Sequence, residues 1–138
     1  MICLFDGDYD FLSNFYECKV TYDGIEYQSS EAAYQAQKCQ SKEERYRFKD
    51  LTPMKAKRLG RKVVMRTDWD DIKVDVMRKI VSAKFDQNPD LKQKLLDTKD
   101  EELIEGNYWG DTFWGVDKYG EKHLGKILME IRGQYVRN

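Results

Sequence analysis

Residues 19–38, KVTYDGIEYQSSEAAYQAQK, decide the fold because they predict a hairpin that runs directly into a helix. Strand-forming residues stand on both sides of Asp23-Gly24, the dipeptide best suited to a two-residue hairpin turn. Ser29-Ser30 can cap a helix, and the run from Glu31 to Lys38 consists largely of good helix formers. We therefore expect two antiparallel strands followed at once by a helix.

Toward the N-terminus, residues 2–5 form a short apolar run, so most of the first thirty residues read as strand. Toward the C-terminus, helix dominates. Thr52-Pro53 supplies a cap and a first-turn proline for a short helix that Gly60 ends. Three more helices are predicted by apolar residues at three- and four-residue steps: Trp69, Ile72, Val76, Ile80 and Ala83 before Asn88-Pro89; Leu91, Leu95 and Leu96; and Leu124, Ile127, Leu128 and Ile131.

The composition fits one globular domain. The chain has 138 residues, of which 41% are hydrophobic and 36% charged, enough for a core beneath a charged surface. The sequence contains no internal repeat and no linker rich in Pro, Gly or Ser. We expect residues 1–138 to form a single compact, helix-rich domain of the α+β class with a small β-sheet.

Charge and cysteine content argue against several classes of function. A formal net charge of −1 removes the strong nonspecific attraction of a basic protein to nucleic acid. Three widely spaced cysteines and a single histidine indicate neither a disulfide framework nor a metal site. No segment approaches the ~18 apolar residues of a membrane span. We expect a cytoplasmic protein with reduced thiols and no membrane contact.

One face of the helix predicted at residues 31–38 carries polar side chains. Glu31, Tyr34, Gln35 and Lys38 follow the i, i+3, i+4, i+7 spacing, while small alanines on the other face allow close packing and leave the polar face to a cleft. Two simpler interpretations stay open: Glu31 complements the helix dipole, worth about 0.3–1 kcal/mol, and Lys38 is solvated. The reactive alternative for Lys38 is a desolvated, neutral amine that attacks the carbonyl carbon of an opened ribose.

Aromatic residues flank the other candidate carboxylate. The segment GNYWGDTFWG at 106–115 lacks helical spacing, and its three glycines favour turns that hold side chains at a surface or cleft. Asp111 follows Trp109 there, where aromatic surface would favour its protonated form and suit it to proton transfer; a turn-forming Asp is about as plausible. Trp69 is either the first core residue of a long helix or a platform for stacking a base, worth about 1–3 kcal/mol.

Familiar sequence motifs for other enzyme classes are absent. There is no G-x-G-x-x-G, G-x-x-x-x-G-K-[ST], G-x-S-x-G or H-E-x-x-H, which removes the simplest dinucleotide, NTPase, serine-hydrolase and zinc-protease interpretations. Carboxylates among aromatic residues remain, and they suit cleavage of a C–N bond at an anomeric carbon. One acid protonates the leaving base, one carboxylate stabilises the sugar cation or activates water, and an aromatic ring holds the base.

Seven blocks of sequence occur in the order typical of a known family: FLSNFY at 11–16, YDGIEY at 22–27, SEAAYQAQK at 30–38, RTDW at 66–69, VDVM at 74–77, NYWGDTFWG at 107–115 and LGKILMEIR at 124–132. On these blocks the chain resembles the NADAR family of YbiA-like N-glycosidases over nearly its whole length. The resemblance implies the NADAR fold. It also implies hydrolysis of the N-glycosidic bond in phosphoribosylamino-pyrimidine intermediates linked to riboflavin biosynthesis, which would dispose of reactive metabolites without a metal or cofactor.

The resemblance also implies roles for single residues. The family pattern places Glu31, Trp69 and Asp111 in the active centre. Family members are associated with removal of ADP-ribose from guanine bases through a lysine adduct, and Lys38 matches that lysine. We therefore assign catalysis to Glu31, Asp111 and Lys38, with the order of acid and base left open. The residues expected to bind substrate are Ser13, Asn14, Tyr34, Trp69 and Trp109.

The expected partner is a small ribosyl or phosphoribosyl compound, with ADP-ribosylated nucleic acid as the alternative; the oligomeric state is not predicted. A third interpretation is a non-catalytic module that binds NAD or ADP-ribose as a signal, although a pure binder has no need for Glu31, Trp69 and Asp111 together. The chain departs from the family at 117–123, DKYGEKH, where a glycine-rich stretch ending in Asn is usual. This change could alter which ribosyl compound fits, and His123 receives no role.

Overall fold

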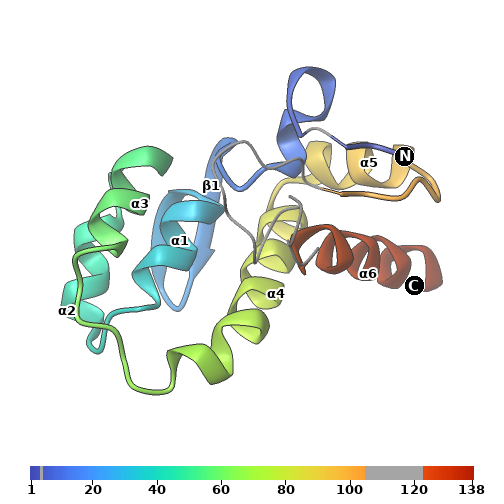
Figure 1. The fold of residues 1–138 in the computed structure, drawn as a ribbon. Helices are drawn as coiled ribbons and strands as arrows, with labels where there is room; N and C mark the ends of the chain where they lie inside the picture. Colours follow the sequence, from blue (N-terminus) through green and yellow to red (C-terminus); the bar gives the residue numbers. More distant parts are fainter. Residues whose placement is uncertain (4, 105–122) are drawn as a thin grey trace. The chain divides into compact units, whose positions relative to one another are not determined.

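The computed structural model describes residues 1–3, 5–104 and 123–138. Its backbone contacts divide the chain into two compact units, one formed by Asn14–Pro89 and the other by Met1–Ser13 with Asp90–Asn138. Helices make up most of the described residues, as Figure 1 shows. The sheet among the described residues has two strands. The predicted class, helix-rich α+β with a small sheet, is confirmed.

The unit Asn14–Pro89 begins with the predicted hairpin. Strands β1 (Glu17–Tyr22) and β2 (Ile25–Ser29) pair antiparallel. Asp23 and Gly24 have φ angles of 50° and 81°, the two positive values that a type I′ turn requires. Val20 lies opposite Tyr27 and both side chains are fully buried, so one face of the hairpin joins the core.

Helix α1 (Ser30–Ala36) follows β2 directly. Its first turn is capped by Ser29, whose Oγ accepts a hydrogen bond from the Ala32 amide at 3.0 Å. The helix ends at Ala36, before Lys38, and every residue in it is buried. Both the alanine face and the polar face are covered because α1 contacts both strands, α3 and α4. The polar face from Glu31 to Gln35 is therefore buried, whereas the sequence predicted that it would line a cleft.

Three helices and a 3-10 turn complete this unit: α2 (Lys42–Arg45), η2 (Tyr46–Phe48), α3 (Pro53–Gly60) and α4 (Trp69–Gln87). Helix α3 is capped as predicted, since Thr52 Oγ1 accepts from the Lys55 amide at 3.3 Å and Pro53 is the first helical residue. Gly60 is the last residue of α3, but the backbone of the next residue, Arg61, still has the right-handed helical conformation. The glycine serves a close contact between helices, described below.

Helix α4 begins at Trp69 and ends before Asn88-Pro89, as predicted, but its buried face is displaced. Of the five predicted core residues, Ile72, Val76 and Ala83 are only half-buried. The buried side chains of α4 are Trp69, Met77, Ile80, Val81, Lys84 and Phe85. Apolar spacing alone therefore located the helix correctly and its buried stripe only in part. Helix α4 packs against β1 and α1, and such tertiary contacts are not encoded in its apolar spacing.

The other unit contains η1 (Gly7–Leu12), α5 (Pro89–Asp97) and α6 (His123–Arg137). The expectation of strand here is wrong over residues 7–12, which form a 3-10 helix. Gly7, with φ of 52°, turns the chain, and the Tyr9 amide then donates to the Asp6 carbonyl at 2.9 Å. Among the residues of this unit that the structure describes, strand character is limited to a parallel bridge between Ile2 and Leu103.

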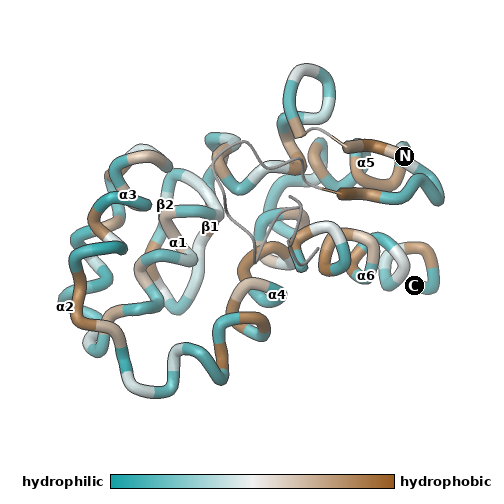
Figure 2. Tube along the Cα trace, viewed as in Figure 1, coloured by the Kyte–Doolittle hydropathy of each residue, from teal (hydrophilic) through white to brown (hydrophobic). Residues whose placement is uncertain are grey.

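Helix α6 is amphipathic, as predicted, and Figure 2 shows hydrophobic and hydrophilic residues alternating along it. Its four predicted apolar residues, from Leu124 to Ile131, are all buried. Gly125 lies against the chain at Leu103, where a Cβ would be 2.0 Å from the carbonyl oxygen. Arg132 donates to Thr98 Oγ1 and to the Glu101 carbonyl, each at 2.8 Å. Within the described residues, no helix combines the length and the apolar character needed to cross a membrane.

Candidate active site

Glu31 is held at the start of α1 by the chain segment around Asn14. The Glu31 amide donates to the Asn14 carbonyl at 3.1 Å, and Ser30 Oγ donates to Asn14 Oδ1 at 2.8 Å. Asn14 Nδ2 lies 3.5 Å from Met77 Sδ on α4. The Glu31 side chain is 7% exposed, so its carboxylate occupies a fixed and largely dry position. These contacts give Asn14 a structural role beside its predicted role in substrate binding.

Gln35 lies one turn after Glu31 and hydrogen-bonds to it. Its Nε2 donates to Glu31 Oε1 at 2.9 Å, and its side chain is 6% exposed. Gln35 Oε1 is buried and has no hydrogen-bond partner among the described residues. An unsatisfied buried acceptor costs about 1–3 kcal/mol, so the arrangement is one that a purely structural glutamine would not favour. A Cβ at Gly60 would lie 2.0 Å from this oxygen.

Lys38 follows α1, and the pKa of its amine is lowered. Burial lowers the pKa of Lys38 below the usual lysine value, whereas the negative charge of Glu31 raises it. The positive charges of Arg61, Lys73 and Lys57 lower it further. Lowered proton affinity is the property that the predicted nucleophilic amine requires.

The backbone connects Lys38 to Trp69. The Arg66 amide donates to the Lys38 carbonyl at 2.9 Å, and the Trp69 amide donates to the Arg66 carbonyl at 3.2 Å. The Arg66 guanidinium pairs with Asp68 at 2.6 Å, which fixes the entry into α4. The chain after α1 and the first turn of α4 are therefore attached at one place.

Trp69 and Tyr34 form an aromatic pair. Their ring centroids are 5.1 Å apart and the planes are tilted by 54°. Trp69 is 4% exposed and Tyr34 equally covered, so in the described residues the indole is a packed side chain of the unit. Stacking of a base on Trp69 stays a prediction, and it would require a ring face that is covered here to become accessible.

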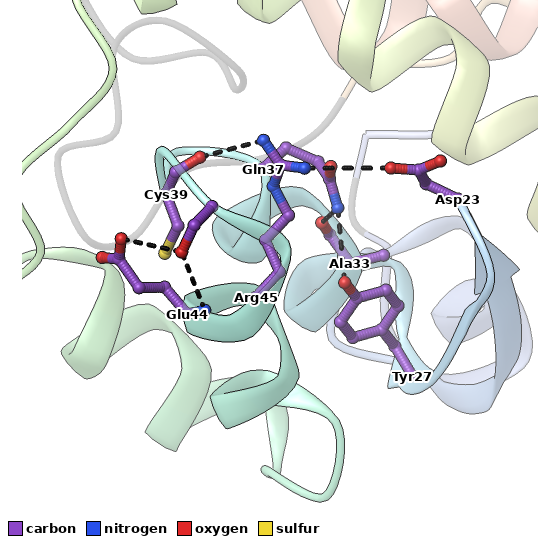
Figure 3. A network of polar contacts seen from close by, with 8 residues as sticks. Asp23, Tyr27, Ala33, Gln37, Cys39, Glu44 and Arg45 are labelled. Carbon is purple, nitrogen blue, oxygen red and sulfur yellow. Dashed lines mark hydrogen bonds and ion pairs between the residues drawn. The ribbon is translucent and has the colours of Figure 1, made fainter.

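A second polar network, drawn in Figure 3, supports the turn that carries Lys38. Gln37 Nε2 donates to the Ala33 carbonyl at 3.0 Å and contacts the Tyr27 hydroxyl at 3.5 Å. Arg45 Nη2 donates to the Cys39 carbonyl at 3.1 Å, and Nη1 lies 3.8 Å from Asp23 Oδ2. Burial raises the pKa of Tyr27 to about 12, so this hydroxyl stays neutral. The network connects the hairpin turn to the chain on both sides of Lys38.

The unit Asn14–Pro89 thus brings together Asn14, Glu31, Tyr34, Lys38 and Trp69, five of the residues predicted for the site. Ser13 belongs to the other unit, where its amide donates to the Asp10 carbonyl at 3.0 Å. Asp111 and Trp109 lie outside the described residues. The described part of the chain contains no cluster of three His, Cys, Asp or Glu side chains suited to a metal ion.

Sequence reasoning placed Gln35 on the polar face but did not name it as a site residue, and it assigned Gly60 to helix termination. The signal for Gln35 was the i, i+4 spacing from Glu31, at which Gln and acidic side chains hydrogen-bond on a helix. Nothing in the local sequence relates Gly60 to Gln35, because the two are 25 positions apart and meet only when α3 packs on α1.

Comparison with known proteins places this arrangement in a family. The family model described as NADAR domain matches residues 4–135. The chain is 37% identical over 134 residues to N-glycosidase YbiA of Escherichia coli, covering 92% of this chain and 82% of that protein. It is 44% identical over 134 residues to a riboflavin biosynthesis protein of Vibrio vulnificus, where it spans only 36% of the relative.

A solved structure agrees with these relatives. The NMR structure of E. coli YbiA has a TM-score of 0.85 and 35% sequence identity, covering 96% of this chain and 81% of that one. The names of the curated relatives bear out the predicted enzyme class, a hydrolase of N-glycosyl compounds. On the family match, the identity and the shared fold, the chain belongs to the NADAR domain family.

Proposed function

We propose that this protein is an N-glycosidase that hydrolyses the bond between ribose and nitrogen in phosphoribosylamino-pyrimidine intermediates of riboflavin biosynthesis. Two sets of names support the substrate class, because curated relatives are called N-glycosidase and riboflavin biosynthesis protein. The substrate would be a small phosphorylated ribosyl compound. The proposal needs residues 1–138 to act as one NADAR domain.

The observation that carries this proposal is the buried carboxylate of Glu31 at the head of α1. Its amide is bonded to Asn14, its Oε1 accepts from Gln35, and Lys38 responds to its charge. A carboxylate fixed in this way can orient a water molecule or stabilise positive charge on a sugar. If Glu31 only complemented the helix dipole, its carboxylate would need neither burial nor a hydrogen bond from a second buried side chain.

The reaction is a displacement at the anomeric carbon. The C–N bond breaks, the oxygen of water bonds to the carbon, and the departing nitrogen takes up a proton. Glu31 and Asp111 share the roles of general acid and of water-orienting base. Trp69 and Tyr34 would contact the leaving base, with Ser13, Asn14 and Trp109 as further binding residues. The products are ribose 5-phosphate and the aminopyrimidine.

The decisive experiment is Glu31→Gln, which keeps the size of the side chain and removes its charge. We expect the release of ribose 5-phosphate to fall by about 10²–10⁴-fold while the circular dichroism spectrum and Tm stay close to wild type. Glu43→Gln, at an exposed position on α2, is the matched control and should keep full activity. Unchanged turnover by Glu31→Gln would remove Glu31 from the mechanism.

The lowered pKa of Lys38 favours a second candidate function, removal of ADP-ribose from guanine bases. In that reaction the base leaves with a proton, the neutral Nζ forms an imine with C1 of the opened ribose, and water then releases the sugar. The depressed proton affinity of this amine is the specific observation in its favour. The two functions share Glu31 and differ in whether Lys38 bonds to the sugar.

Borohydride trapping separates the two candidates. With ADP-ribosylated guanine as substrate, the second function predicts a reduced adduct on the peptide that contains Lys38, detected by mass spectrometry. Lys38→Arg should lose the adduct, while Lys42→Arg, on the surface of α2, should retain it. Consumption of the substrate with no adduct would leave water as the nucleophile. Binding of ADP-ribose without turnover of either compound or of NAD would favour a non-catalytic binding module.

A further inference from the structure

Gln35 is the most unusual polar side chain in the unit Asn14–Pro89. It is 6% exposed, yet one of its two polar atoms is unsatisfied among the described residues. The other, Nε2, donates to Glu31 Oε1 at 2.9 Å. Gln37 is buried to about the same degree, at 5% exposed. Its Nε2 donates to the Ala33 carbonyl and contacts the Tyr27 hydroxyl, so its amide is bonded away from Glu31.

The orientation of the Gln35 amide follows from its neighbours. An ionised carboxylate only accepts hydrogen bonds, so the amide nitrogen must face Glu31 and the amide oxygen must face away. Facing away brings Oε1 against Gly60, where a Cβ would lie 2.0 Å from Oε1 and 2.8 Å from Cδ. A side chain at position 60 would therefore force the Gln35 amide to shift from the position in which it donates to Glu31. Gly60 and Glu31 together hold the Gln35 amide from its two sides.

We infer that Gln35 is a positioning residue for the proposed hydrolysis, which fixes the rotation of the Glu31 carboxylate, and that Gly60 keeps Gln35 in that position. This inference rests on the proposed catalytic role of Glu31. With Oε1 held by Gln35, the direction of the second oxygen, Oε2, is set by the same bond. A donor to the charged carboxylate also favours its ionised form, the form that can orient water.

Among the described residues, basic groups near the pair lie on or next to α1, α3 and α4. Lys38 follows α1 and interacts with Glu31, while Lys57 and Arg61 at the end of α3 and Lys73 on α4 act on Lys38. All four are basic, and Lys38 is the one among them that interacts with the Glu31 charge. Gln35 differs from them because it is neutral and acts through the direction of one short bond. A variant that removes only the amide therefore tests positioning while leaving these charges in place.

The main test compares Gln35→Met with Gln37→Met. Methionine keeps the length of the side chain and cannot hydrogen-bond to Glu31. For Gln35→Met we expect kcat to fall about tenfold or more while KM changes less than about twofold, and the acid limb of the kcat profile to move to higher pH. Gln37→Met removes an equally buried amide from the same helix end and should leave that limb in place. The Tm of each variant is measured, and kcat is calculated per folded molecule, so that a loss of stability is not mistaken for a loss of activity.

Gly60→Ala provides a second test in which Gln35 is chemically unchanged. It should lower kcat and move the acid limb in the same direction as Gln35→Met. The double variant should be no slower than the more impaired single variant, because both changes break the same bond. Additive losses in kcat would show that Gly60 acts separately from Gln35 and would overturn that part of the inference.

An NMR titration, which requires no catalysis, tests the positioning role of Gln35 independently of the proposed function. In protein labelled with ¹³C at the Glu carboxyl carbons, the Glu31 resonance should titrate at higher pH in Gln35→Met than in wild type, and Gln37→Met should match wild type. An unmoved titration in Gln35→Met, with Glu31→Gln inactive, contradicts the positioning role alone. A moved titration, with Glu31→Gln fully active, supports the bond and contradicts the proposed function.

Discussion

Within Asn14–Pro89, Glu31 and Lys84 are buried and Lys38 is half-buried, and each of these charged side chains has a different surrounding. Glu31 accepts from Gln35, Lys38 is flanked by other basic groups, and Lys84 is 1% exposed between aromatic rings, with Nζ 5.3 Å from the Phe85 ring centroid. Removing charged groups from water is costly unless partners compensate. The carboxylate of Glu31 and the amine of Lys38 compensate one another in part, so the state of one depends on the other.

The coupling between these two groups gives a prediction with a definite sign. Glu31 is the group that raises the pKa of Lys38, against the lowering by burial. In Glu31→Gln the raising charge is removed, so the pKa of Lys38 should fall further below the usual lysine value. The measurement is an NMR titration of the Lys38 ¹³Cε resonance. Glu43→Gln, with its exposed carboxylate on α2, should leave the titration unmoved; a rise in Glu31→Gln would contradict the coupling.

At the scale of elements, short local signals set where helices and strands begin and end. The hairpin turns at two residues with positive φ, α1 begins where Ser29 caps it, and α3 begins at a threonine followed by proline. Each device lies within four residues of the feature it determines. The hairpin has the largest influence on the site, since β2 runs directly into α1 and so positions Glu31.

Substitutions at Gly24 test how much the turn contributes. Its φ of 81° is costly for a residue with a Cβ, so Gly24→Ala should lower the free energy of unfolding by about 1–2 kcal/mol, measured by urea denaturation. The nearest atom to the new Cβ would be Lys42 Nζ at 3.1 Å, the flexible end of a side chain that can move away. Gly24→Asn should cost less because asparagine tolerates positive φ. Equal losses for both variants would rule out backbone strain as the cause.

At the scale of the whole molecule, the chain passes between its two compact units twice, after Ser13 and after Pro89. The NADAR domain match spans both units, from residue 4 to residue 135. Each unit holds about half of the chain, a size at which independent stability is marginal. We expect the two units to unfold as one cooperative domain.

Two glycines on α6 make this expectation testable. A Cβ on Gly125 would lie 2.0 Å from the Leu103 carbonyl oxygen, so Gly125→Ala should destabilise its unit by about 1–3 kcal/mol. Gly133→Ala is the control, since among the described residues its Cβ would meet the flexible end of Arg137 at 3.3 Å. Hydrogen exchange should then show lost protection in α1 as well as in α6 for Gly125→Ala. Lost protection confined to α6 and its unit would indicate two independent domains.

The limits of sequence reasoning are visible along α4. Apolar spacing predicted the helix and its end at Asn88-Pro89, but Ile72 and Val76 from the predicted stripe are half-buried and Lys84 is covered instead. The strand expected over residues 7–12 is a 3-10 helix. Along α4 the buried stripe depends on packing against segments distant in sequence, whereas at residues 7–12 a local turn at Gly7, with the Tyr9 amide bonded to the Asp6 carbonyl, replaces the expected strand.

For this protein, the sequence by itself determined the hairpin, the caps of α1 and α3, the order of α1, α3, α4, α5 and α6, and the polar face of α1 that carries Glu31 and Tyr34. Those features depend on residues within a few positions of one another, so local stereochemistry is enough to specify them. Only the tertiary structure decided that this face is buried, that Tyr34 packs on Trp69 and that Gln35 lies against Gly60. These facts depend on helices that meet across long stretches of chain, where burial is set by packing and no local pattern records the partner.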